Sequence, residues 1–243
     1  MKNKLSLACL ICAGALTLGG SAFAQEQTGA AGKSVLFVEN EAKWAKGNTP
    51  QIKKQLEEAG WKFELATPER IMKENHPVYL FSFASLDLQK GRYCDIWETL
   101  WNKVKAGAVV VFQPINHFSF VKISEDETLD LRVRGIEKTD PKDRTAAYLP
   151  GDWLKKPCDL EKEFKKCMTP AYVAIPDSPE VWQVLATQPR SSEEKNVRDP
   201  FILFRPYGKG FIVVMGPTNH SFSIGVFLAN LYENRDALRG KSL

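Results

Sequence analysis

Short runs of apolar residues, separated by segments with helical periodicity, constrain the fold of this chain more than any other feature. Residues 34–38 and 108–112 are continuous apolar runs, as expected of strands that are buried on both faces of a parallel sheet. Residues 62–66 and 78–83 have the pattern of two further strands between them. Strands that alternate with helices in this way predict a sheet that helices cover on both faces.

Helical segments fill the gaps between these strands. A capped start and Pro50 begin a helix that Gly60 ends, and residues 68–75 have the pattern of a short second helix. Asp95 and Glu98 predict a capping box at the start of a third helix. The alternation predicts an α/β fold with an open, doubly wound, mostly parallel sheet of the flavodoxin-like kind.

This alternation stops between residues 122 and 198. Charged and proline-rich stretches dominate there, with one convincing strand at 181–186. We interpret 122–198 as an irregular, β-containing insertion packed on one edge of the sheet. Two strands and a final helix follow, at 201–204, 211–215 and 222–234. We therefore expect residues 34–243 to form a single domain.

Residues 1–24 have the pattern of a signal peptide. Two lysines precede an apolar run at 5–18, and Ala22 and Ala24 place small residues where signal peptidase cleaves. We expect cleavage after Ala24, a linker at 25–33, and export of a soluble protein to the periplasm or the extracellular space. The apolar run is shorter than the roughly 18–20 residues that a membrane span needs, and no later stretch reaches that length.

Charge and composition exclude several classes of protein. The 243 residues carry a net charge of +4, and Lys2 and Lys4 of the leader supply part of it. So small a charge gives no reason to expect nucleic acid or an anionic membrane as a partner. Hydrophobic residues at 44% and charged residues at 26% are ordinary for a globular protein and exclude a disordered chain or a coiled coil.

Three cysteines follow the leader. Cys158 and Cys167 lie close in sequence around a helical segment, and an oxidising compartment favours a disulfide between them. Cys94 is then left over. It lies beside Asp95 rather than beside a base or a cation, so we expect a buried, unreactive thiol there.

His117 and His220 end two copies of the sequence Pro-x-Asn-His, and each copy follows a predicted buried strand after one residue. In open α/β sheets, ligands bind at the carboxyl ends of the strands. If the two strands are neighbours, both histidines converge there with Glu39 and Asn40, which follow the first strand. The remaining histidine of the mature chain, His76, we interpret as an ordinary surface or turn residue.

Three interpretations of this repeated pattern are open. His117 and His220 could act as general acid and base, or could bind a divalent metal with Glu39 as a third ligand. In the structural alternative, Asn219 or Ser221 caps the last helix, Asn116 closes a turn, and each imidazole bonds to a backbone carbonyl. Two copies of the pattern at equivalent strand ends favour a functional pocket.

The stretches that lead to the two histidines resemble a known family. Val-Lys-Ala-Gly-Ala-Val-Val-Val-Phe before His117, and Tyr-Gly-Lys-Gly-Phe-Ile-Val-Val-Met-Gly before His220, are similar to segments of ThuA-like (trehalose-utilisation) proteins. That family lies within the class I glutamine amidotransferase-like superfamily, and the resemblance covers most of residues 35–238. It implies the amidotransferase-like sheet and a strand-end site that acts on, or binds, a carbohydrate-derived small molecule.

The chain departs from this superfamily at the positions that carry glutamine hydrolysis. Amidotransferases have a nucleophilic cysteine in a sharp turn after the equivalent strand, where this chain has Gln113. They also have a glutamate two residues beyond the late histidine, where this chain has Phe222. Without a thiol beside the histidine, amidotransferase activity is not expected. The histidine cluster that often follows the first strand in ThuA-like proteins is replaced here by residues 39–44.

The leading hypothesis is an exported ThuA-like protein whose strand-end crevice binds or processes a carbohydrate-derived small molecule. His117 and His220 are then the acid/base or polarising groups, and Trp44 stacks on a sugar ring. The expected binding residues are Glu39, Asn40, Trp44, Asn116 and Asn219. The alternative is a catalytically inert binding or scaffold domain of the same fold. The sequence leaves the substrate, a divalent metal cofactor and the oligomeric state open.

Overall fold

The computed structural model describes residues 33–39, 48–81, 95–113, 118–123, 128–135, 146–166, 172–176, 178–190, 194, 196–216 and 222–242. All of these belong to one compact unit of the chain, Gly32–Leu243. The architecture described below is that of this unit.

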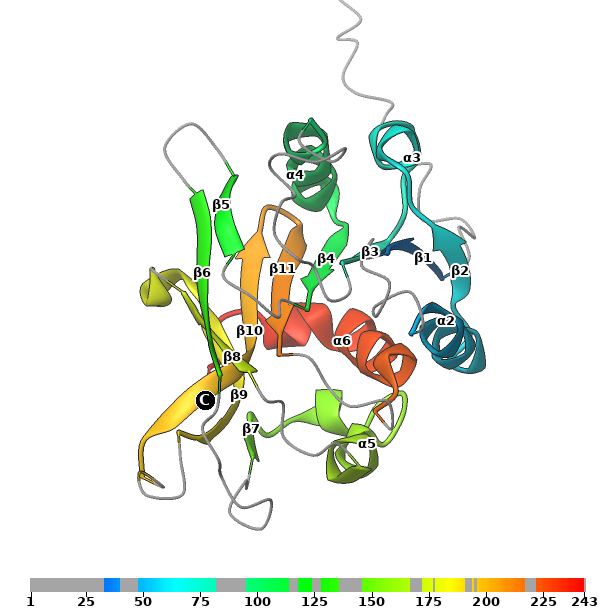
Figure 1. Ribbon diagram of the computed structural model, residues 1–243. Helices are drawn as coiled ribbons and strands as arrows, with labels where there is room; N and C mark the ends of the chain where they lie inside the picture. Colours follow the sequence, from blue (N-terminus) through cyan, green and yellow to red (C-terminus); the bar gives the residue numbers. More distant parts are fainter. Residues whose placement is uncertain are drawn as a thin grey trace, which may run out of the picture. The chain divides into compact units, whose positions relative to one another are not determined.

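An eight-stranded sheet with the order β2-β1-β3-β4-β11-β10-β9-β7 forms its centre (Figure 1). The first five strands in that order are parallel, and the last three are antiparallel. The strands are β1 (Ser34–Val38), β2 (Lys62–Leu65), β3 (Val78–Phe81), β4 (Val109–Phe112), β7 (Ala147–Tyr148), β9 (Gln183–Pro189), β10 (Arg198–Tyr207) and β11 (Gly210–Met215). This mixed α/β sheet confirms the predicted fold class.

Helices cover both faces of the sheet because every central strand is apolar on both sides. Val35 and Phe37 of β1 belong to the apolar cluster of α2 and α6, whereas Leu36 and Val38 belong to that of α3 and α4 (Figure 1). The helices are α2 (Thr49–Glu58), α3 (Pro68–Lys73), α4 (Trp97–Ala106), α5 (Leu160–Lys166) and α6 (Ile224–Leu238). Two apolar layers thus hold the sheet between the helices.

A second, three-stranded antiparallel sheet has the order β5-β6-β8. Its strands are β5 (Phe118–Lys122), β6 (Thr128–Gly135) and β8 (Tyr172–Pro176). β8 packs against β10 of the main sheet. The stretch 122–198 therefore adds strands to both sheets. β6 and β8 belong to the second sheet, and β7 and β9 extend the antiparallel side of the main sheet.

Two predicted elements begin differently in the structure. The strand expected at 181–186 begins at Gln183, because Pro179 starts a 3₁₀ turn, η4 (Pro179–Val181), before it. The capping box expected from Asp95 and Glu98 is not made: the N-cap of α4 is Ile96, and no side chain caps this helix. The start of α4 therefore lacks the side-chain acceptor that usually satisfies its first amides.

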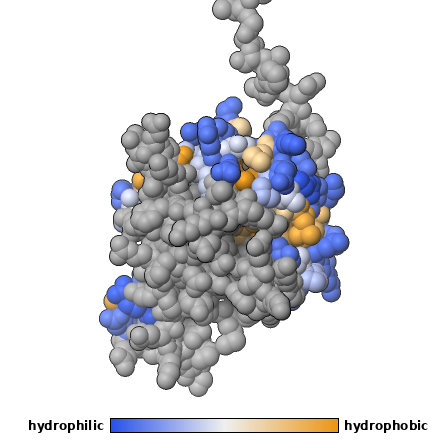
Figure 2. Space-filling view, turned by 45° about the horizontal axis from the view of Figure 1, so that its top comes forward, coloured by the Kyte–Doolittle hydropathy of each residue, from blue (hydrophilic) through white to orange (hydrophobic). Residues whose placement is uncertain are grey.

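The described surface is mostly hydrophilic, with small apolar patches on the face seen in Figure 2. The large apolar side chains exposed among the described residues are scattered: Leu65, Met72, Val181 and Val197. Scattered exposed apolar residues are normal for a globular surface and mark no docking site. Among the described residues, no helix is long and apolar enough to cross a bilayer.

Candidate functional site

β4 and β11, the strands that lead to the two Pro-x-Asn-His sequences, lie side by side in the sheet. They are parallel, and their register pairs Val109 with Phe211 and Phe112 with Val214. The condition under which the two sequences converge is therefore met. Gln113 and Gly216 directly follow these strands at the carboxyl edge, and both are buried.

Of the catalytic and binding residues predicted from the sequence, Glu39 alone falls within the described part of the chain. It is half-buried, and its carboxylate accepts a hydrogen bond from the hydroxyl of Thr49, the first residue of α2. β1 is separated from β4 by β3. The other predicted site residues lie outside the described residues, and their convergence remains a prediction: Asn40, Trp44, Asn116, His117, Asn219 and His220.

Side chains from two other helices accept hydrogen bonds from the first backbone N–H groups of α6, which begins at the same carboxyl edge. Glu163 of α5 accepts the backbone N–H of Ser223 at 3.2 Å, and Gln55 of α2 accepts that of Ile224 at 3.3 Å. The N-cap residue Ser223 accepts the N–H of Val226 at 3.3 Å. These contacts join α5 and α2 to the start of α6, and they occupy amides that could otherwise bind an anion.

Phe222 occupies the position at which an amidotransferase carries its triad glutamate. Its ring is buried and lies 5.4 Å from the ring of Phe164 and 6.1 Å from that of Phe227, measured between centroids. The position therefore belongs to the apolar core between α5 and α6 and carries no carboxylate.

Of the predicted disulfide pair, Cys158 is described; it is half-exposed and forms no disulfide with another described residue. Cys167 and the third cysteine, Cys94, lie outside the described residues. The pairing of Cys158 with Cys167 remains a prediction.

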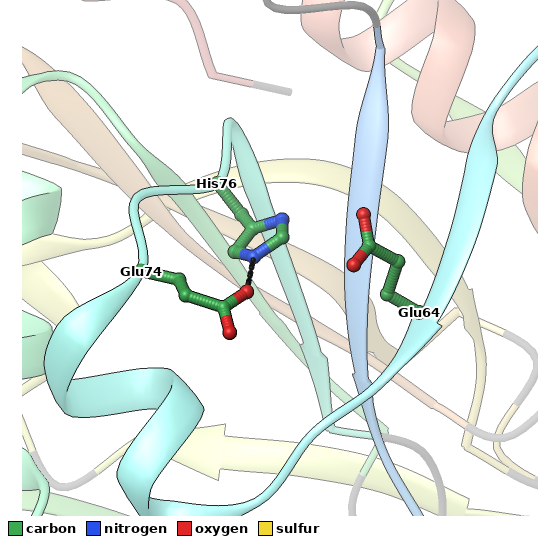
Figure 3. Close-up of side chains that lie close together, drawn as sticks. All are labelled: Glu64, Glu74 and His76. Atoms are coloured by element: carbon green, nitrogen blue, oxygen red, sulfur yellow. Dashed lines mark hydrogen bonds and ion pairs between the residues drawn. The ribbon is translucent and has the colours of Figure 1, made fainter.

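A second cluster of polar side chains, Glu64, Glu74 and His76, lies near the amino ends of the parallel strands (Figure 3). One donor atom from each of the three lies within 4.8 Å of the other two. Nε2 of His76 lies 3.1 Å from Oε2 of Glu74, and Nδ1 lies 3.1 Å from the hydroxyl of Ser34 in β1. The imidazole is buried and has a partner at both nitrogens.

Arg70 of α3 joins the two carboxylates of this cluster. Its Nη2 bonds to Glu64 and lies 2.6 Å from Oε2 of Glu74, while Nε donates to Oε1 of Glu74 at 2.8 Å. Nη1 donates to the carbonyl of Leu65 at 2.7 Å. The Arg70 and His76 hydrogen bonds lower the pKa of Glu74 to about 2. Lys62 and Arg70 likewise lower the pKa of Glu64.

Two carboxylates and an imidazole are ligand types that bind divalent metals, but the negative charge of this cluster is already balanced. Arg70 and Lys62 already neutralise the two carboxylates, and the guanidinium bonds to both of them. A metal ion would have to displace Arg70 from those carboxylates. We therefore interpret the cluster as an ionic network that joins β1, β2 and α3.

Sequence reasoning misassigned His76. It is 8% exposed rather than a surface residue, because Ser34 and Glu74 hold it between β1 and the end of α3. Ser34 is 42 residues away in sequence, so no local pattern could show the contact. Pro77, the next residue, favours a loop at this position and does not indicate the contact of His76 with Ser34.

No protein-family model matches this chain, and no curated protein matches its sequence. Among solved structures, the β-galactosidase from Bacillus circulans sp. alkalophilus aligns with 84% of this chain at 12% identity and a TM-score of 0.50. The chain spans 31% of the length of that enzyme and of a similar β-galactosidase from Rahnella sp. R3. At this identity the likeness is one of fold.

Two other similar structures come from proteins of about the same length. A ThuA-like protein from Parabacteroides merdae aligns over 87% of this chain and 91% of its own, with 13% identity and a TM-score of 0.45. A GMP synthase protein from Thermoplasma acidophilum aligns over 86% of this chain and 96% of its own, with 8% identity and a TM-score of 0.43.

Proposed function

We propose that this chain is an exported ThuA-like protein that binds or processes a carbohydrate-derived small molecule at the carboxyl ends of β4 and β11. One observation carries the proposal. The two strands are parallel neighbours in register, and each continues into the same sequence, Pro-x-Asn-His. Segments that leave adjacent parallel strands at the same edge begin side by side, at the place where such folds keep their ligands.

In this proposal, His117 and His220 are the reactive or polarising groups. An imidazole exchanges protons near neutral pH, so two of them beside a bound polyol can donate and accept protons at its hydroxyls. Glu39 and the amides of Asn116 and Asn219 bind the ligand's oxygens. Asn40 and Trp44, which follow β1, complete the expected binding surface.

The proposed site does not hydrolyse glutamine. The residue that directly follows β4 is Gln113, and the triad position after His220 is a buried phenylalanine. A thiolate nucleophile and its histidine are both required for that reaction. We expect no ammonia release from glutamine above a heat-inactivated control. Release that is lost in Cys94→Ser would contradict this.

Export and the disulfide are further parts of the proposal. Expression of the full chain in a bacterium should yield a periplasmic or secreted protein whose N-terminus is Gln25. Non-reducing peptide mapping of that protein should show Cys158 bonded to Cys167 and Cys94 unmodified. A cytoplasmic protein that retains residues 1–24, or a disulfide that contains Cys94, would contradict these assignments.

Thermal unfolding tests the binding proposal directly. A ligand that binds only the native state must raise its stability, so the melting temperature should rise with ligand concentration. We would titrate the purified protein with neutral sugars, sugar acids and divalent metal ions, and repeat each positive titration with His117→Ala and His220→Ala. A saccharide response that both substitutions abolish supports the proposal. No response to any sugar favours the inert scaffold.

A further inference from the structure

The outer edge of β9 is only partly covered by the neighbouring strand. Among the described strands, β7 is that outer neighbour, and it pairs only with Ala186 and Thr187 of β9. Gln183 and Val184, the first two residues of β9, are not paired with β7. Backbone groups on an open sheet edge can pair with a strand of another chain, so this part of β9 needs a cover.

The sequence of β9 favours pairing with a copy of itself. Residues 182–188, Trp-Gln-Val-Leu-Ala-Thr-Gln, contain no charged residue and no proline. Uncharged segments of about six or seven residues that form strands readily are the ones that pair with identical segments. A second copy of this chain is therefore the partner that an open edge of β9 fits.

Residues 239–242, which follow α6 and which we call the strap, cover this part of the edge. The hydroxyl oxygen of Ser242 accepts the backbone N–H of Val184 at 2.9 Å. The side-chain Nε2 of Gln183 donates to the backbone carbonyl of Lys241 at 2.8 Å. A side-chain oxygen thus satisfies an edge N–H of β9, and the hydrogen-bond ladder ends there.

The strap lies at the surface and is held by polar contacts. Nη2 of Arg239 donates to the carbonyls of Gly208 at 3.3 Å and Lys209 at 3.0 Å, in the turn between β10 and β11. All four strap residues are exposed, whereas Leu238, the last residue of α6, is 2% exposed. A segment with so few buried contacts can detach while the helix before it stays in the core.

We propose that the strap prevents self-association: while it is bound, β9 cannot pair with β9 of a second copy of this chain. The strap and the second copy compete for the same groups, because the N–H of Val184 is already donated to Ser242. Release of the strap opens the edge. Antiparallel pairing of two such edges about a two-fold axis then gives a closed dimer.

Removal of the strap tests this proposal. A variant without residues 239–243 should keep the far-UV circular dichroism of the full chain, because α6 and the core are retained. In sedimentation velocity between about 1 and 100 µM, it should add a species of about twice the mass that increases with concentration, and the full chain should not. Lys241→Ala is the matched control. Lys241 contacts β9 through its backbone carbonyl, so this variant should sediment as the full chain does.

A substitution in β9 shows whether this edge carries the association. In the variant without the strap, Gln183→Lys places a charge on the open edge and should remove the dimer. A dimer that persists undiminished overturns the proposal, as does a folded variant without the strap that keeps the mass of the full chain. A dimer formed equally by Lys241→Ala also overturns it.

A second variant keeps the test decisive if removal of residues 239–243 unfolds the protein. Gln183→Val in the full chain removes the side-chain bonds to the carbonyls of Leu238 and Lys241 and retains a strand-forming residue. It should weaken the strap and give the same concentration-dependent dimer in smaller amount. Absence of that dimer over the whole concentration range would then overturn the proposal.

Discussion

At the residue scale, Asn230 shows how a polar side chain in an apolar helix can hold two parts of the chain together. It lies on α6 and is fully buried. Its amide donates to the carbonyls of Trp153 at 2.8 Å and Cys158 at 2.7 Å, and its oxygen accepts the N–H of Cys158 at 3.1 Å. The side-chain amide of Asn230 thus fixes the segment that precedes α5. Helix α5 in turn carries Glu163, which accepts the N–H of Ser223 at the start of α6.

Asn230→Ala should lower the free energy of unfolding by about 2 kcal/mol or more, because it leaves buried backbone groups of Trp153 and Cys158 without partners. Urea denaturation measures the loss. Asn234→Ala is the matched control: Asn234 is one turn further along α6 and donates to the carbonyl of Lys156 at the exposed surface. Its loss should be well below 1 kcal/mol. Equal losses in the two variants would contradict this account.

Glu74 contributes to the way the free energy of unfolding depends on pH in the acid range. Its pKa is about 2 in the folded protein against an ordinary 4.5, because Arg70 and then His76 bond to its carboxylate. A carboxyl whose pKa is lowered by folding stabilises the native state above the unfolded pKa, and that contribution is lost as pH falls towards the folded pKa.

The wild-type protein should therefore be more stable than Glu74→Gln at pH 7, and the difference should shrink between about pH 4.5 and pH 2. Urea midpoints at several pH values measure it. Glu58→Gln removes one member of an exposed pair with Lys54 on α2 and should change stability little at neutral pH. A Glu74 difference that stays constant down to pH 2 would show that its ionisation does not stabilise the fold.

At the scale of elements, α2 and α6 approach closely enough to exclude a methyl group. A Cβ built on Gly225 would lie 2.1 Å from the carbonyl oxygen of Gln55 and 2.8 Å from the Cβ of Ala59. The indole of Trp61 donates to the carbonyl of Gly225 at the same contact. The glycine therefore allows α2 and α6 to pack this closely.

Gly225→Ala should destabilise the protein by about 1–3 kcal/mol, because the helices must separate to admit the new methyl group. The direction of the change in stability distinguishes a tight contact from an open one, because the same substitution at an open helix position stabilises by up to about 1 kcal/mol. Thermal or urea unfolding of the variant measures it. Any gain in stability would mean that α2 and α6 have room for a side chain there.

At the scale of the whole molecule, the parts predictable from sequence are those set by local patterning. The apolar runs at 34–38 and 108–112 are strands because both of their faces are buried, and this needs no knowledge of partners. The starts of β9 and α4 differ from the prediction, because Pro179 begins a 3₁₀ turn before β9, and Ile96 rather than Asp95 is the N-cap of α4. His76 was misassigned for the same reason, as its partner Ser34 comes from a distant strand.

The candidate site was predictable in part. The repeated Pro-x-Asn-His sequence, together with the rule that ligands bind at strand ends, led to a candidate site on the condition that β4 and β11 are neighbours. Their parallel pairing meets that condition. The positions of His117 and His220 relative to one another remain a prediction.

The central claim is that His117 and His220 belong to one site and serve function more than folding. The most direct measurement is a double-mutant cycle on sugar affinity and on unfolding free energy, with His117→Ala, His220→Ala and the double variant. Each single change should cost less than about 1 kcal/mol of stability, and both should weaken binding of the same sugar. The double variant should lose little more than either single one, because groups that act as a unit are non-additive. Fully additive losses in binding, or losses of several kcal/mol in stability with affinity unchanged, would contradict the account.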